Sequence, residues 1–195
     1  MHFVSTGALP HQFRHSNRHR RVLACLLVGS LLPACAPAPI FPPDVRDKPD
    51  RTVTFENLTA NPDHYQDRTV ELGGQIVGST TDQDEVKMLV RELPIRTTPV
   101  YGPVDNGRLN GMFVIRFTGK IGAQDVQDGN MVVVIGAVMG AVATSLTGTP
   151  VRRLTVTAEC FHIWRTQGNP IDLLRQPTKH STACLLTTGP CLRRY

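Results

Sequence analysis

The sequence lacks several patterns that would place it in a familiar class. It has no G-x-S-x-G nucleophile motif, no glycine-rich loop opening a helix to hold phosphate, and no internal repeat. Its longest apolar run, residues 131–143, is well short of the about 20 residues that a membrane-spanning helix needs. With 41% hydrophobic and 19% charged residues, the 195-residue chain is neither a disordered segment nor a polytopic membrane protein. Its length is typical of one domain.

Acidic residues are absent from the first 34 positions, which hold Arg14, Arg18, Arg20 and Arg21. The formal net charge of the whole chain is +5, but without this segment 17 basic residues face 16 acidic ones. Residues 51–168 hold 11 basic and 12 acidic residues. The basicity therefore belongs to a leader, and a nucleic-acid partner is not expected for the folded part.

The leader has the order of a secretory signal: the basic segment 15–21, then the apolar segment 22–32, then small residues. The following Leu32-Pro33-Ala34-Cys35 resembles the lipobox of bacterial lipoproteins. This resemblance implies cleavage by signal peptidase II between Ala34 and Cys35, and a diacylglycerol on the Cys35 thiol with a further acyl chain on its amino group. Ala36, in place of Asp, favours sorting to the outer membrane. An ordinary secretory signal that ends in cysteine is the alternative.

Residues 35–50 carry five prolines and few large apolar side chains, so we expect an extended tether that reaches at most about 45 Å. A short helix is expected over 55–60, ended by Pro62 and with Tyr65 packed nearby. Residues 94–109 contain prolines and glycines and are expected to form a long loop. The last segment, 169–195, has no periodicity and is expected to be disordered.

Five stretches have strand patterns: 69–78, 85–93, 111–118, 131–143 and 152–165. Residues 79–84 form a polar turn, so the first two stretches predict a hairpin. Gly73-Gly74 suggests a bend or bulge, and a change of alternation near Cys160 predicts a second bulge. The fourth stretch, apolar on both faces, indicates a fully buried central strand. We therefore expect an all-β domain over 51–168, a small five- to six-stranded OB-like barrel with one short N-terminal helix. A two-sheet sandwich is the alternative.

Several segments, in order, resemble the Slp family of bacterial outer-membrane lipoproteins, the starvation-inducible type. They are Asn61-Pro62-Asp63-His64-Tyr65, residues 69–77, Glu92-Leu93-Pro94, Gly107-Arg108, residues 132–140 and Phe161-His162-Ile163-Trp164. The resemblance implies an envelope protein linked to starvation or stress, with no established catalytic residue and no cofactor. The chain departs from the family in its aromatic-poor C-terminus and in Gly107-Arg108-Leu109, which replaces a phenylalanine-containing segment. A read-through or frame error at the gene's end would equally explain the tail.

Candidate chemical sites are few. Cys160 and His162 provide at most half of a zinc site, to which His64 and Cys184 would have to be added, so we expect a core thiol beside a rim imidazole instead. Cys184 and Cys191 are candidates for a disulfide in the oxidising periplasm. The acidic residues Asp82, Asp84 and Glu85 indicate a solvated turn rather than a calcium site. Tyr65, Tyr101 and Trp164 could line a glycan or peptide surface, but packing explains each as well.

The sequence thus predicts a non-enzymatic lipoprotein without catalytic residues, metal or cofactor. It would be anchored in the outer membrane through Cys35, face the periplasm, and serve envelope structure or stress tolerance. Its expected partner is membrane lipid, and no envelope protein or glycan partner can be named. The alternative is a periplasmic module that binds a glycan, a peptide or a small envelope ligand.

Overall fold

A computed structural model describes residues 39–98, 100–108, 110–145, 148–171, 180–186 and 189–194, the positions from 185 onward by their backbone only. The chain divides into two compact units, residues 1–38 and 39–195. Only the second contains described residues. Among the described residues no helix has the length and apolar character to cross a membrane.

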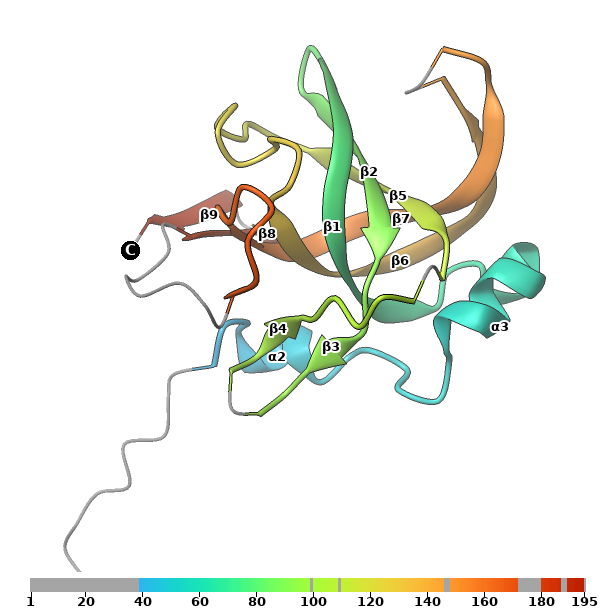
Figure 1. Ribbon diagram of the computed structural model, residues 1–195, viewed down its shortest axis with the longest axis horizontal. Helices are drawn as coiled ribbons and strands as arrows, with labels where there is room; N and C mark the ends of the chain where they lie inside the picture. Colours follow the sequence, from blue (N-terminus) through green and yellow to red (C-terminus); the bar gives the residue numbers. More distant parts are fainter. Residues whose placement is uncertain are drawn as a thin grey trace, which may run out of the picture. The chain divides into compact units, whose positions relative to one another are not determined.

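Five long strands form the frame of the domain (Figure 1). They are β1 (Thr69–Asp82), β2 (Glu85–Glu92), β5 (Met112–Thr118), β6 (Met131–Thr144) and β7 (Val151–Trp164). Neighbouring strands are antiparallel in the order β5-β2-β1-β6-β7, and β5 also pairs with β7 in parallel. The hydrogen bonds therefore run around a ring. The expectation of a mostly β domain is confirmed, and each of the five predicted strands is present.

The interior of the ring is one apolar cluster, here called the inner cluster. Alternate residues of each strand supply it, as the period-2 patterns predicted. From β1, β2 and β5 they include Val70, Leu72, Ile76, Val86, Met88, Val90, Phe113, Ile115 and Phe117. Residues 131–136 of β6 are all buried, but most residues from Met139 onward are partly or fully exposed, so the expectation of a fully buried strand holds only for the first half.

The glycine pair in β1 allows close approach of neighbouring segments. A Cβ on Gly74 would lie 2.3 Å from the carbonyl oxygen of Arg91, and one on Gly73 would lie 2.9 Å from that of Leu93. The bulge of β1 lies instead at Val77, which is skipped in the register between Ile76 and Gly78. The predicted bend at the glycines was therefore placed three residues too early.

The bulge predicted near Cys160 is confirmed. Ile135 is paired with Cys160 and Gly136 with Ala158, so Glu159 is the extra residue of β7. The bulge changes the face on which alternate residues lie. Ala158 and Phe161 belong to the inner cluster, whereas Cys160 and Trp164 lie in a second cluster on the opposite face. Because of the bulge, Cys160 and Ala158 lie on opposite faces although they are two residues apart in the same strand.

Residues 39–50 are not an extended spacer. They contain the short helix α2 (Pro43–Arg46), and Phe41 and Val45 are 3% and 4% exposed in the second cluster. The prolines suggested extension, but here Pro43 occupies the first turn of a helix, where its missing N–H costs nothing. The segment before the domain is therefore much shorter than the tether predicted from composition.

The helix predicted over residues 55–60 is confirmed as α3 (Phe55–Ala60). Thr54 caps it, accepting a hydrogen bond from the backbone N–H of Asn57, whose side chain bonds back to the Thr54 N–H. The 3₁₀ helix η2 (Pro62–Tyr65) follows, and Tyr65 packs against the inner cluster. The described part of the domain thus has two short α-helices, rather than the single one expected.

Two further pairs of strands were missed. The predicted loop contains β3 (Ile95–Arg96) paired with β4 (Gly102–Pro103). The segment expected to be disordered contains β8 (His180–Leu186) and β9 (Gly189–Arg194), which extend the sheet beyond β7 to seven strands. β8 and β9 lie outside the ring, whose five strands are within the five to six expected, but the expectation of a disordered tail was wrong for these residues.

Candidate functional site

The residues that the lipobox resemblance implicates, Ala34 and Cys35, lie outside the described residues. Their cleavage and acylation therefore stay predictions. Within the domain, Cys160, Cys184, Trp164 and Tyr101 belong to the second cluster or pack against it, whereas the other candidates lie elsewhere.

The second cluster contains a disulfide between Cys160 of β7 and Cys184 of β8. The two residues are directly opposite one another in the strand register. The predicted bond between Cys184 and Cys191 is therefore not the one in the structure, and Cys160 is not a free thiol. Spacing along the chain could not reveal the pairing, because the pairing depends on β8 aligning with β7.

His162 lies beside this disulfide and is 3% exposed, so it is a buried residue and not a rim imidazole. Its Nδ1 lies 2.5 Å from Oγ1 of Thr182, and its ring contacts Trp164 and His180 with centroids 4.3 and 5.0 Å away. Burial, and secondarily the charge of His180, lower the pKa of His162 to about 3. His64 lies on η2, apart from this cluster, and no group of metal ligands occurs among the described residues.

The buried His162 should make the domain less stable in mild acid. Unfolded chains bind a proton at this histidine below pH 6.5, whereas the folded domain does so only near pH 3. This one group therefore contributes full stability above pH 6.5 and loses it as the pH falls, by about 2 kcal/mol between pH 7 and pH 5. Urea unfolding at both pH values should show that a His162→Gln variant loses less stability than the wild type by this amount. A His64→Gln variant, altered at an exposed histidine, should retain the wild-type pH dependence, and equal dependence in all three proteins would contradict the assignment.

The aromatic residues proposed as a ligand surface are packing residues. Trp164 is 6% exposed in the second cluster, and the ring of Tyr101 lies 6.4 Å from it. The Tyr101 hydroxyl donates a hydrogen bond to Glu71, and burial together with this carboxylate raises the pKa of Tyr101. Tyr65 packs against the other cluster. The three rings therefore do not form one surface.

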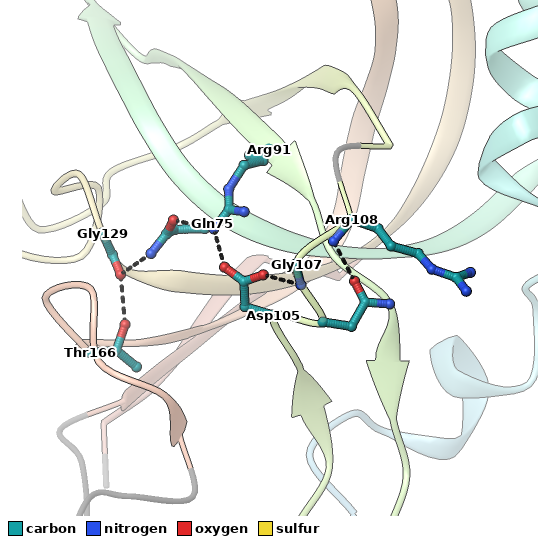
Figure 2. A network of polar contacts seen from close by, with 8 residues as sticks. Gln75, Arg91, Asp105, Gly107, Arg108, Gly129 and Thr166 are labelled. Atoms are coloured by element: carbon teal, nitrogen blue, oxygen red, sulfur yellow. Dashed lines mark hydrogen bonds and ion pairs between the residues drawn. The ribbon is translucent and has the colours of Figure 1, made fainter.

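A polar network fixes the loop that follows β4 (Figure 2). The guanidinium of Arg91 donates to Gln75 Oε1 at 2.9 Å and to Asp105 Oδ2 at 2.7 Å. Asp105 also accepts a hydrogen bond from the backbone N–H of Gly107, and together these donors lower the pKa of its carboxyl group. Arg91 thereby ties the loop to β1 and β2.

The network continues toward the end of β7. Gln75 Nε2 and the hydroxyl of Thr166 both donate to the carbonyl of Gly129, at 3.5 and 2.7 Å.

On the other side of the loop, Glu92 is 7% exposed and accepts a hydrogen bond from Asn110 at 2.6 Å. Burial raises the pKa of this carboxyl group. Glu92 and Gly107, two positions on which the sequence resemblance rested, thus each form a hydrogen bond that holds this loop.

The side chain of Arg108 extends away from the network, and its backbone N–H donates to Asn106 Oδ1 (Figure 2). The network thus presents an exposed cation on a loop held in a fixed position. The donors of this network are hydrogen-bonded to acceptors of the same network. Such an arrangement supports binding or rigidity rather than proton transfer.

The comparison with protein-family models decides the family. The model of the outer membrane lipoprotein Slp family matches residues 32–188, more than half of the chain. The chain belongs to the Slp family. Among curated proteins no match was found.

The Slp match begins at Leu32, the first residue of the lipobox-like segment, and continues through β8. The second cluster, the loop network and the Cys160–Cys184 disulfide all lie within it. The departure of the C-terminus from the expected Slp pattern therefore does not separate residues 169–188 from the family. The frame-error explanation is not needed for that part of the tail.

In this Slp-family domain, the acidic residues Asp82, Asp84 and Glu85 lie at the polar turn of the first hairpin. β1 ends at Asp82 and β2 begins at Glu85, which leaves a two-residue turn. Glu85 forms ion pairs with Lys87 and with Arg116 of β5, and both lower the pKa of its carboxyl group. These charges connect neighbouring strands at the surface, where such pairs contribute up to about 1 kcal/mol.

Proposed function

We propose that this Slp-family protein is held at the outer membrane by acyl chains on Cys35, faces the periplasm, and serves the envelope in a structural, non-enzymatic role under stress or starvation. The single observation that carries the proposal is the extent of the family match, which starts at the lipobox-like segment and covers the domain. Export fits the charge distribution, because four arginines and no acidic residue precede Ala34.

The character of the domain supports a structural role. Its charged side chains largely pair with one another, as in Lys48–Glu159, Arg91–Asp105 and Arg165–Asp125. The disulfide suits an oxidising compartment such as the periplasm. His162, Glu71, Glu92 and Asp105 have hydrogen-bond partners in the clusters and networks above, which gives no support for an acid–base pair among them.

The alternative role, a binding module for a glycan, a peptide or a small envelope ligand, is supported by the closed ring of strands. We interpret the ring as an OB-like barrel. Each of the five strands pairs with the next in the order β5-β2-β1-β6-β7, and a parallel pairing between β5 and β7 closes the ring. Barrels of this type commonly bind oligosaccharides on the outer face of their second and third strands, which here are β2 and β5. On that face the buried pair Leu89 and Val114 lies next to the cross-strand pair Lys87 and Arg116.

Acylation of Cys35 can be tested directly by growing expressing cells with an alkyne fatty acid. The wild-type chain should be labelled and should fractionate with membranes, and globomycin should block its maturation. A Cys35→Ser variant should lose labelling completely, because serine supplies no thiol for the diacylglycerol. A Cys25→Ser variant is the matched control, since it removes the other cysteine of the leader and should keep full labelling. Persistent labelling of Cys35→Ser would refute the anchor.

The structural role and the binding role can be separated with the soluble chain that begins at residue 36. A fragment beginning at residue 51 is unsuitable, because it would lack the buried Phe41 and Val45. The immobilised chain would be exposed to purified envelope glycans and peptides. Saturable retention that a Lys87→Glu substitution weakens would favour the binding module, and absence of retention would favour the structural role.

A further inference from the structure

We propose that residues 39–46 and the hairpin of β3 and β4 form a membrane-apposed end of the domain, lying against the headgroup surface that holds the acyl anchor. This inference rests on the proposed acylation of Cys35. It adds which side of the domain meets the lipid and which side faces the periplasm.

The first argument is the length of chain between anchor and domain. Five peptide units separate Cys35 from Ile40, which packs against the second cluster, and the next residue, Phe41, is buried. Even fully extended, this segment reaches only about 17 Å. Val45, one helical turn later, is also buried, so further chain could be released only by removing two apolar side chains from the core.

The second argument is the size of the domain. A compact domain of about 130 residues is roughly 36 Å across, about twice the reach of the linking segment. The surface around Ile40 must therefore stay within about 17 Å of the anchor, and the domain cannot turn its opposite side to the lipid. A tether of the length predicted from composition would have allowed any orientation.

The third argument is the surface next to this attachment point. Ile95 and Tyr101, at the base of the β3–β4 hairpin, pack against the same cluster as Ile40. Beyond them the described residues of the hairpin tip are uncharged, namely Thr97, Thr98 and Val100. Val100 is 42% exposed and is the most exposed large apolar side chain near the attachment point. An uncharged tip with an exposed valine can approach a headgroup layer without charge repulsion.

The remaining charges of this end nearly balance one another, with Arg96 of β3 as one basic side chain in excess. Residues 44–51 contain three acidic and three basic side chains, among them the pair Arg46–Asp47. Figure 1 shows α2 with β3 and β4 at one end of the domain, whereas the β1–β2 turn lies at the other. The proposed orientation would therefore direct the β1–β2 turn into the periplasm, together with the outer face of β2 beside it.

Photolabelling from the lipid side tests this orientation. The acylated full chain is reconstituted into vesicles of phosphatidylethanolamine and phosphatidylglycerol that contain a phospholipid with a diazirine in its headgroup. After irradiation, peptides are mapped by mass spectrometry. Peptides from 39–46 and 95–101 should be labelled several-fold more than peptides from 79–88. Equal labelling, or the reverse order, would overturn the orientation.

Matched variants sharpen the result. Val100→Asp should lower labelling of the hairpin several-fold, because a carboxylate is repelled by the anionic surface. Val151→Asp alters a valine of similar exposure, 40%, at the start of β7 and should leave the hairpin labelling unchanged. Equal effects of the two variants would contradict the proposal. Inserting ten Gly/Ser residues after Ala38 should even out the labelling, since a longer tether permits other orientations.

The intact mass of the chain separates the two levels of the proposal. A chain without the mass of its acyl groups would refute the proposed anchor, whatever the labelling. An acylated chain labelled first at residues 79–88 would refute only the orientation.

Discussion

Replacing Gly136 by alanine is expected to lower the free energy of unfolding of the domain by about 3 kcal/mol, at the upper end of the usual overpacking range. Gly136 lies in β6 at the register shift opposite Ala158. A Cβ there would be 2.2 Å from the carbonyl oxygen of Thr157 and 2.9 Å from the Cα of Ala158. Both are backbone atoms of β7 and cannot rotate away, so the methyl group must separate β6 from β7 or distort the bulge.

Gly78→Ala is the matched control, because it adds the same methyl group to a strand glycine without a clash. The nearest atom to its Cβ would be the Cβ of Leu89 at 4.0 Å. This variant should be as stable as the wild type or slightly more so, by less than about 1 kcal/mol, since alanine restricts the unfolded chain. Urea unfolding monitored by circular dichroism measures both. Equal midpoints for Gly136→Ala and the wild type would show that β6 and β7 approach less closely than described.

The five long strands could be predicted because each has one face in the inner cluster. Val70, Leu72 and Ile76 alternate with more polar residues, and so do Phe113, Ile115 and Phe117. A dry interior that accepts every second side chain leaves this period in the sequence whatever the strand order. The position of helix α3 also depends on nearby residues, since Thr54, Asn57 and Pro62 mark its ends.

The parts that were missed depend on contacts between distant segments. Phe41 and Val45 are too widely separated among prolines to show a period, and they are buried only because β6 and β7 have apolar residues on both faces. β8 was missed because its position follows from pairing with β7, not from its own alternation. The second cluster therefore could not be inferred from local pattern, although the doubly apolar β6 was a signal that its outer face needed a cover.

Long-range contacts also limit what the sequence could predict about membrane attachment. The family match and the lipobox-like segment indicate where the protein resides, and the sequence alone predicted both. The shortness of the free linker does not follow from its composition, since five prolines suggested extension. It follows from the burial of Phe41, and it is the basis of the orientation proposed above.

Removing the Cys160–Cys184 disulfide is expected to cost about 3 kcal/mol of stability. The bond joins residues 24 apart, and closing a loop of this size in the unfolded chain corresponds to about 3 kcal/mol in the chain-entropy model. The double variant Cys160→Ala, Cys184→Ala is the cleaner test, because a single substitution would leave a thiol able to pair elsewhere. Amides of β8 should also exchange faster with solvent in the double variant, since β8 is joined to β7 by this bond and by their strand pairing.

Cys191→Ala is the matched control and also decides between the two pairings. Cys191 occupies the register position opposite Cys184 on β9, so both Cys160 and Cys191 are neighbours of Cys184 across a strand pair. If Cys160 is the partner, the Cys191→Ala variant should unfold at the wild-type denaturant midpoint, and the double variant should account for the entire effect of reduction by dithiothreitol. If Cys191→Ala instead reproduces the loss, the bond that stabilises the protein joins Cys184 to Cys191, and β8 is held to β7 only by hydrogen bonds and packing. The second cluster would then lack its covalent link, and the burial of Trp164 and His162 would depend on the fit of β8 alone.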